Sequence, residues 1–213
     1  MKKYAFLLFA AAVLFLSCKS LPVIEHPGRY KEHMAAGFYL KDKYQLTHSI
    51  KAELPNGDRL LLIGVTSVDP AQRSIRAVMM SVEGLVLLDA SLGNNAVTVN
   101  RAIPAFESSD FVKALMDDLK LIYFAPEARS PVYGKQPDGK SIARFGCADG
   151  TTIDVITQGG ETKINKYDSS YGLTRTVNIM QLNSKGLPQR LELVAHGLFG
   201  YTLFLELISF EKM

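Results

Sequence analysis

Few side chains in this sequence have the types and spacing that catalysis or metal binding requires. The four histidines (His26, His33, His48 and His196) are scattered, and no two have the i, i+2 or i, i+4 spacing of a zinc site. Cys147 has no base nearby in the sequence to activate its thiol. We therefore expect no metal site, and we expect Cys147 to be a small buried or strand-edge residue.

The pair Asp117 and Asp118 could suggest acid–base catalysis. Adjacent residues on a helix point apart, however, so we expect both carboxylates to extend a solvated helix face. The sequence also contains no Gly-x-Ser-x-Gly elbow, no phosphate-binding loop and no dinucleotide fingerprint. We predict no catalytic residue and no cofactor. An esterase or transferase assembled from scattered residues ranks last among the alternatives.

The clearest chemical signal lies at the N-terminus. Two lysines precede a run of thirteen mostly apolar residues, 4–16, and the small residue Ser17 precedes Cys18. This order predicts a secretory signal over residues 1–17. The junction resembles the lipobox of bacterial lipoproteins, with Phe15 where leucine is usual, and the resemblance implies acylation of Cys18. The alternatives are an ordinary signal peptide or a membrane anchor, although a spanning helix needs about 20 residues.

Removal of the signal changes the charge of the chain and suggests its location. Two lysines are lost, so the formal charge falls from +3 to +1, and no basic patch argues for a nucleic-acid partner. Lys19 stands where aspartate would signal inner-membrane retention, which favours the outer membrane, facing the periplasm. We divide the chain into the signal, a lipidated cysteine with tether and N-terminal segment over 18–44, and one domain over 45–213.

Along the sequence, the domain is predicted to contain strands before and after a single helix. Five strands are predicted first, at 45–54, 59–68, 73–82, 85–92 and 96–103, and their short connections favour an antiparallel meander. Six more are predicted at 141–148, 152–157, 163–167, 174–182, 190–196 and 201–210. Helix and strands segregate, so we predict an α+β fold with a large curved antiparallel sheet of about 11 strands.

The helix is predicted over residues 110–124. Phe111, Leu115, Leu119 and Ile122 recur at spacings of three and four, which is typical of an amphipathic helix. The opposite side carries Lys113, Asp117, Asp118 and Lys120. Pro126 limits the helix, and a second short helical turn is possible near 127–133. Several strands carry apolar residues on both faces, so we expect the helix to cover the concave face of the sheet.

This layout resembles the outer-membrane lipoprotein localisation factors LolA and LolB, and more closely an uncharacterised family of bacterial lipoproteins thought to share their fold. The resemblance rests on Gly84-Leu-Val-Leu-Leu-Asp89, Ala102-Ile-Pro104 and Phe111 to Pro126, together with Ile164-Asn-Lys-Tyr167 and Tyr201-Thr-Leu-Phe-Leu-Glu-Leu207. Phe124 stands where relatives have tryptophan. The resemblance implies a half-barrel that is partly plugged by the helix and holds acyl chains, with a role in carrying or assembling a lipid-like product.

Alternation along the strands suggests which side chains line such a cavity. The candidates are Leu60, Leu62, Val78, Met80, Leu85, Leu87, Val97 and Val99 from the strands, and Phe111, Leu115, Met116 and Leu119 from the helix. Such stripes are also what a packed core requires. Two hypotheses follow: a lipid-anchored periplasmic protein that binds a lipid, an acyl chain or a similar apolar product, or a scaffolding lipoprotein with a packed core that docks an unknown protein partner.

Overall fold

The computed structural model describes residues 20–28, 37–128, 130–198 and 200–213. The predicted signal over 1–17 and Cys18 lie outside the described residues. No helix within the described ranges is both long enough and apolar enough to cross a bilayer.

The described residues form twelve strands, a short 3₁₀ turn and one α-helix. The first half of the chain contributes β1 (Tyr44–Glu53), β2 (Arg59–Asp69), β3 (Ser74–Ser81), β4 (Val86–Gly93) and β5 (Ala96–Ala102). The turn η2 (Pro104–Phe106) and helix α2 (Ser109–Tyr123) follow. The second half contributes β6 (Val132–Lys135), β7 (Ser141–Gly146), β8 (Thr152–Gln158), β9 (Glu161–Tyr167), β10 (Leu173–Leu182), β11 (Pro188–Ala195) and β12 (Tyr201–Lys212).

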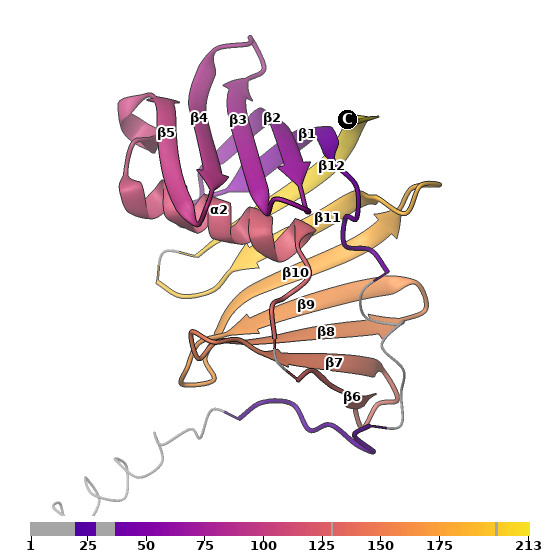
Figure 1. The fold of residues 1–213 in the computed structure, drawn as a ribbon. Coiled ribbons are helices and arrows are strands. Elements are labelled where there is room, and N and C mark those ends of the chain that lie inside the picture. Colours follow the sequence, from indigo (N-terminus) through magenta and orange to yellow (C-terminus); the bar gives the residue numbers. More distant parts are fainter. Residues whose placement is uncertain (1–19, 29–36, 129, 199) are drawn as a thin grey trace, which may run out of the picture.

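All twelve strands belong to one antiparallel sheet in the order β5-β4-β3-β2-β1-β12-β11-β10-β9-β8-β7-β6. The first and last strands therefore meet at the centre of the sheet, where β1 pairs with β12. The sheet is curved and open, with β5 at one edge and β6 at the other (Figure 1). The predicted α+β half-barrel is confirmed. The chain must pass from one edge to the other between β5 and β6, and α2 lies on this connection.

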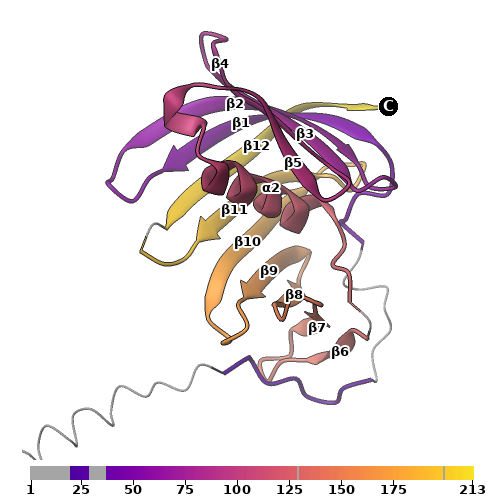
Figure 2. The same ribbon diagram turned by 60° about the vertical axis from the view of Figure 1, so that its left-hand side comes forward.

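Helix α2 lies on the concave side of the sheet, beneath the arch of β1–β5 (Figure 2). Val112 and Met116 are fully buried, because this side of the helix packs into the core. The helix begins after Ser108 and ends before Phe124, whose backbone is extended (φ −106°, ψ 132°). Pro126 follows two residues later and prevents the helix from continuing.

Strand β6 replaces the second helical turn that the sequence allowed near 127–133. It has only four residues, too few for a strand period to be distinguished from a helical turn. Its hydrogen bonds come from partners distant in sequence: β7 on one side and Glu25 on the other, with N···O distances of 2.7 and 3.1 Å to Lys135. Tertiary pairing therefore decided the conformation of this segment.

Residues 20–28, which we call the N-terminal strap, pack along β6. Besides the Glu25 bridge, the Gly28 N–H donates to the Tyr133 carbonyl at 2.9 Å, and the Arg144 guanidinium donates to the Pro22 carbonyl at 2.8 Å. A side chain at Gly134 would clash with Ile24, so the strap needs glycine at this point. The predicted tether is thus attached to the domain over its described residues.

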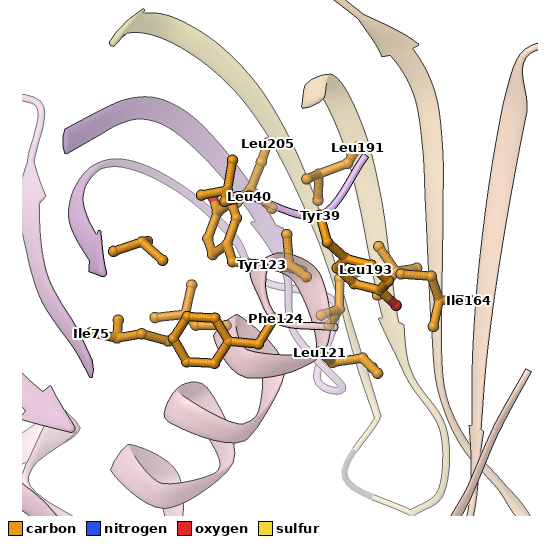
Figure 3. Close-up of a cluster of buried hydrophobic side chains, with 14 of the residues drawn as sticks. Tyr39, Leu40, Ile75, Leu121, Tyr123, Phe124, Ile164, Leu191, Leu193 and Leu205 are labelled. Carbon is orange, nitrogen blue, oxygen red and sulfur yellow. The ribbon is translucent and has the colours of Figure 1, made fainter. Parts of the chain in front are cut away.

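A second N-terminal segment, residues 38–40, packs into the core beside the end of α2. Phe38, Tyr39 and Leu40 are buried there, and the Leu40 N–H donates to the Tyr123 carbonyl at the end of α2 (3.4 Å). Figure 3 shows Tyr39, Leu40 and Tyr123 in the same buried cluster as Leu193. The side chains of residues 38–40 fill the space beside the last turn of α2.

Candidate functional site

The inner face of the first sheet half is set by strand register. Gly64 and Thr66 of β2 lie opposite Met79 and Ala77 of β3, so these four residues share one face. The buried residues of this face lie on the side of the sheet that faces α2. Strand β1 presents His48, Ile50 and Ala52 on the same side, because His48 lies opposite Gly64.

A cavity of about 200 Å³ lies between this face and helix α2. We call it the chamber. It is bounded by β1, β2 and β3, by β11 and β12, and by the side of α2 that carries the Phe111–Ile122 stripe. Most of its walls are aliphatic or aromatic side chains, including Ile50, Leu54, Leu60, Leu62, Met79, Phe106, Phe111, Leu115, Leu119, Ile122, Leu193, Leu203 and Leu205. An apolar ligand group fits such walls, whereas they offer little to a polar substrate.

Four polar side chains also border the chamber: His48, Thr66, Asp118 and Tyr201. His48 has 2 % of its surface exposed, and burial lowers the pKa of its imidazole from 6.5 to about 4. The ring is therefore neutral at physiological pH. Neutral imidazole adds no charge to the walls of the chamber, which keeps that part of the site compatible with hydrocarbon.

Asp118 is the buried charge of the site, contrary to the expectation that it would extend the solvated face. Its carboxylate accepts a hydrogen bond from Arg175 Nε at 2.7 Å and another from the Tyr201 hydroxyl. Burial raises the pKa of Asp118, and the two partners oppose that rise. Asp117 lies at the surface of the helix, as predicted, with its side chain partly exposed. It forms an ion pair with Lys120 at 2.5 Å.

The Asp118–Arg175–Tyr201 triad joins α2 to strands β10 and β12. The Arg175 guanidinium also lies over the Tyr201 ring, 5.7 Å from its centroid, so the three groups form one compact unit. A buried carboxylate without partners would be costly. The structure avoids this cost by placing both donors on the sheet directly opposite the helix. The triad thereby fixes how α2 sits above the chamber.

Six of the twelve predicted cavity residues border the chamber: Leu60, Leu62, Val78, Phe111, Leu115 and Leu119. Met116 does not, because it lies on the side of α2 that packs into the core. Met80 pairs with Ile63 on the outer face of the sheet, and its neighbour Met79 points inward instead. Residues 77 to 80 are all apolar, but the exposed Arg76 alternates with Val78 and Met80, and this signal could have marked their set as the outer one.

The remaining predicted residues lie away from the chamber. Leu85 is in the β3–β4 turn with 55 % of its surface exposed. Leu87 is buried beside a register shift in β4. Val97 and Val99 lie on edge strand β5 and are 38 % and 42 % exposed. They share a face with buried Leu92 and Ala90, but β5 has no neighbouring strand on its outer side among the described residues.

Sequence reasoning missed the contributions of β1, β11 and β12. Alternation would have suggested Tyr201, Leu203 and Leu205, since they recur at every second position. No sequence pattern places β12 beside β1, however, and this pairing brings Leu203 opposite Ala52. Within the described ranges, no three histidine, cysteine, aspartate or glutamate side chains gather into a group that could hold a metal ion.

Comparison with known proteins identifies the fold. No protein-family model matches the chain, and no curated protein matches its sequence. The crystal structure of a LolA superfamily protein from Nitrosomonas europaea superposes with a TM-score of 0.55 and 10 % sequence identity, over 84 % of this chain and 90 % of that chain. The chain has a LolA-like fold. In this LolA-like half-barrel, the chamber lies between the open sheet and its helix.

Proposed function

We propose that this protein binds a lipid, an acyl chain or a similar apolar product in the chamber, and does so as a lipid-anchored protein on the periplasmic side of the outer membrane. The observation that carries the proposal is the apolar chamber between α2 and the inner face of the sheet. The LolA-like fold supports a carrier function and gives no reason to invoke catalysis.

The volume of the chamber suggests how much ligand it accepts. Its 200 Å³ is below the roughly 300–1,000 Å³ usual for ligand pockets. One stretch of acyl chain fits this space better than a whole multi-chain lipid. Each buried methylene contributes about 0.8 kcal/mol, so five of them contribute roughly 4 kcal/mol. Displacement of α2 would admit a longer chain.

The membrane part of the proposal rests on Cys18. A single acyl chain gives only marginal membrane binding, whereas two or more make anchoring stable. The described strap keeps residues 20–28 on the domain. A lipidated Cys18 would therefore hold the domain close to the bilayer surface, within reach of membrane-derived ligands.

A second function, docking of a protein partner, is favoured by one observation. Leu61, Val82 and Leu85 are each more than half exposed on the sheet half formed by β1–β5. A scaffolding lipoprotein could use such apolar side chains as contacts. This alternative predicts a stoichiometric protein in crosslinks from cells, and no lipid in the purified protein.

The ligand proposal is tested by filling the chamber. Leu62 points into it, and its neighbour Leu61 lies on the outer face with 56 % of its surface exposed. We expect Leu62→Trp to weaken binding of a fluorescent fatty acid at least roughly tenfold, because the indole occupies the space of the acyl chain. Leu61→Trp is the matched control and should bind like the wild type.

Native mass spectrometry of protein purified without detergent provides an independent readout, with an acyl-bearing mass adduct expected on the wild type. If Leu62→Trp unfolds, as circular dichroism would show, Leu203→Phe at the β12 wall takes its place. Absence of any adduct together with absence of probe uptake by folded wild-type protein would refute the proposal.

A further inference from the structure

Helix α2 divides the concave side into two unlike compartments. The chamber lies along its apolar stripe. Along its charged side lie two adjoining hollows of about 230 and 350 Å³, which share Asp117 and Lys166 in their walls. We call them together the polar cleft. Its walls include Lys113 and Arg175.

The chamber and the polar cleft meet at Asp118, which borders both. Its partners lie one on each side: Tyr201 lines the chamber and Arg175 lines the cleft. The boundary is therefore a polar wall at the third turn of α2. Nearer the start of the helix, Ala114 lines the cleft with only a methyl group. An extended molecule could have its apolar end in one compartment and a polar end in the other.

Lys166 is a cation in the wall of the cleft that has no ion-pair partner among the described residues. It is half-buried and lies on the inner face, opposite Arg175 in the β9–β10 register. Among the described residues, none forms a hydrogen bond with its Nζ or approaches it as an ion-pair partner within 4.0 Å.

The acids that act on Lys166 electrostatically are Asp118 and Asp149, and both are already engaged. Arg175 and Tyr201 donate to Asp118. The backbone N–H and the hydroxyl of Thr151 donate to Asp149 at 2.9 and 2.7 Å. The three donors of the Lys166 ammonium therefore remain available in a partly dehydrated position, where an anionic oxygen would bind well.

The other charges of the cleft do not change this conclusion. Asp117 is neutralised by Lys120 at 2.5 Å. Asp110 and Lys113 are both exposed, stand one helical turn apart at the outer rim and carry opposite signs. Lys166 is thus the half-buried cation of the cleft that has no ion-pair partner among the described residues, whereas Lys113 is exposed at the rim.

Building on the proposed function, we propose that the ligand is an amphiphile with an anionic head, whose carboxylate or phosphate binds Lys166 in the polar cleft while its apolar chain occupies the chamber. The juxtaposition of an apolar cavity and an unpartnered ammonium across α2 carries this inference. The structure thereby selects acidic amphiphiles over neutral ones such as long-chain alcohols.

The test compares three twelve-carbon ligands, dodecanoate, dodecyl phosphate and dodecanol, by displacement of a fluorescent fatty-acid probe at low ionic strength. We expect the wild type to bind both anions roughly three- to tenfold more tightly than the alcohol, because only the anions form a charge-assisted hydrogen bond with Lys166. Lys166→Gln should bring the affinity for both anions down to that for dodecanol. Salt should reduce the preference in the wild type.

Lys163→Gln is the matched control, because Lys163 is an exposed lysine on the same strand but on the outer face, opposite Asn178. It should retain the full preference. Inorganic phosphate alone should not displace the probe, and displacement by it would indicate a free-anion site instead of a headgroup site. Equal affinity of the wild type for dodecanoate and dodecanol would overturn the headgroup inference and leave the chamber proposal intact. Failure of all three chains to bind would overturn the proposed function itself.

Discussion

At the scale of single residues, the inner face shows how burial changes side-chain chemistry. His48 and Asp118 are both almost completely buried, yet only Asp118 is charged within the fold. The carboxylate has two donors that compensate for lost water, and the imidazole is more stable without its proton. This difference gives the protein a specific dependence on pH.

The free energy of unfolding should fall as the pH is lowered from about 6.5 to 4. The pKa of His48 is about 4 in the folded chain and near 6.5 when unfolded, so the unfolded state takes up the proton first. The histidine contributes full stability above pH 6.5, and about 3 kcal/mol is lost by pH 4. Urea denaturation across this range measures the loss.

His48→Gln should remove that component, because glutamine does not titrate. His196→Gln is the control. Partial burial and the charge of Arg175 lower the pKa of His196, but its side chain is exposed and loses much less water on folding than that of His48. A His48→Gln variant whose stability declines as steeply as that of the wild type would contradict the prediction.

At the scale of elements, α2 is the part of the fold whose attachment matters for function. One side of the helix packs into the core through Val112 and Met116, one side faces the chamber, and Asp118 joins it to β10 and β12. Apolar packing fixes the rotation of the helix about its axis only approximately, because the apolar stripe is broad. A single buried charge with two fixed donors defines the rotation more narrowly, because a different rotation would leave the carboxylate unpaired.

Tyr201→Phe should therefore lower the free energy of unfolding by about 2 kcal/mol, since it removes a hydrogen bond to a buried charge. Tyr123→Phe provides the contrast. The Tyr123 hydroxyl is fully buried and has no hydrogen-bond partner within the described residues, so its removal should be neutral or slightly stabilising. Chemical denaturation of both variants measures the difference, and equal destabilisation by the two would show that the triad does not hold the helix.

At the scale of the whole molecule, the chain order explains why a helix crosses the concave face. The first half builds the sheet outward from β1 to β5, and the second half returns from the other edge, β6, to β12 beside β1. The connection between the two edges must span the open side. An amphipathic helix satisfies its own backbone hydrogen bonds there and buries its apolar side against the sheet.

The proposed anchor belongs to this scale as well, and the two cysteines make its test simple. In cells grown with a clickable palmitate analogue, we expect the wild type to carry the label and to sediment with membranes. Cys18→Ala should lose both properties, because it removes the acylated thiol. Cys147→Ala, whose residue is half-buried in the domain, should keep the label. Persistence of the label in Cys18→Ala would contradict the anchor.

Local sequence patterns account for nearly all elements of the fold. Eleven of the twelve strands and the helix follow from local alternation, turn residues and a helical stripe, because these signals depend on neighbours within a few positions. The resemblance built on that order led to the same fold as the structural comparison. Phe111, Leu115 and Leu119, which the helical stripe predicted on one face, all border the chamber, since a helical face is set by a period of 3.6 residues.

The rest of the site depends on contacts between residues that are distant in the sequence. The register with β2 places Met79 on the inner face and Met80 on the outer face. Tertiary pairing with β7 and Glu25 made β6 a strand. The tertiary structure also buried Asp118 against Arg175, 57 residues away along the chain. Burial and charge pairing are set by groups remote in sequence, so no local pattern could have revealed that the helix has a polar cleft on one side and an apolar chamber on the other.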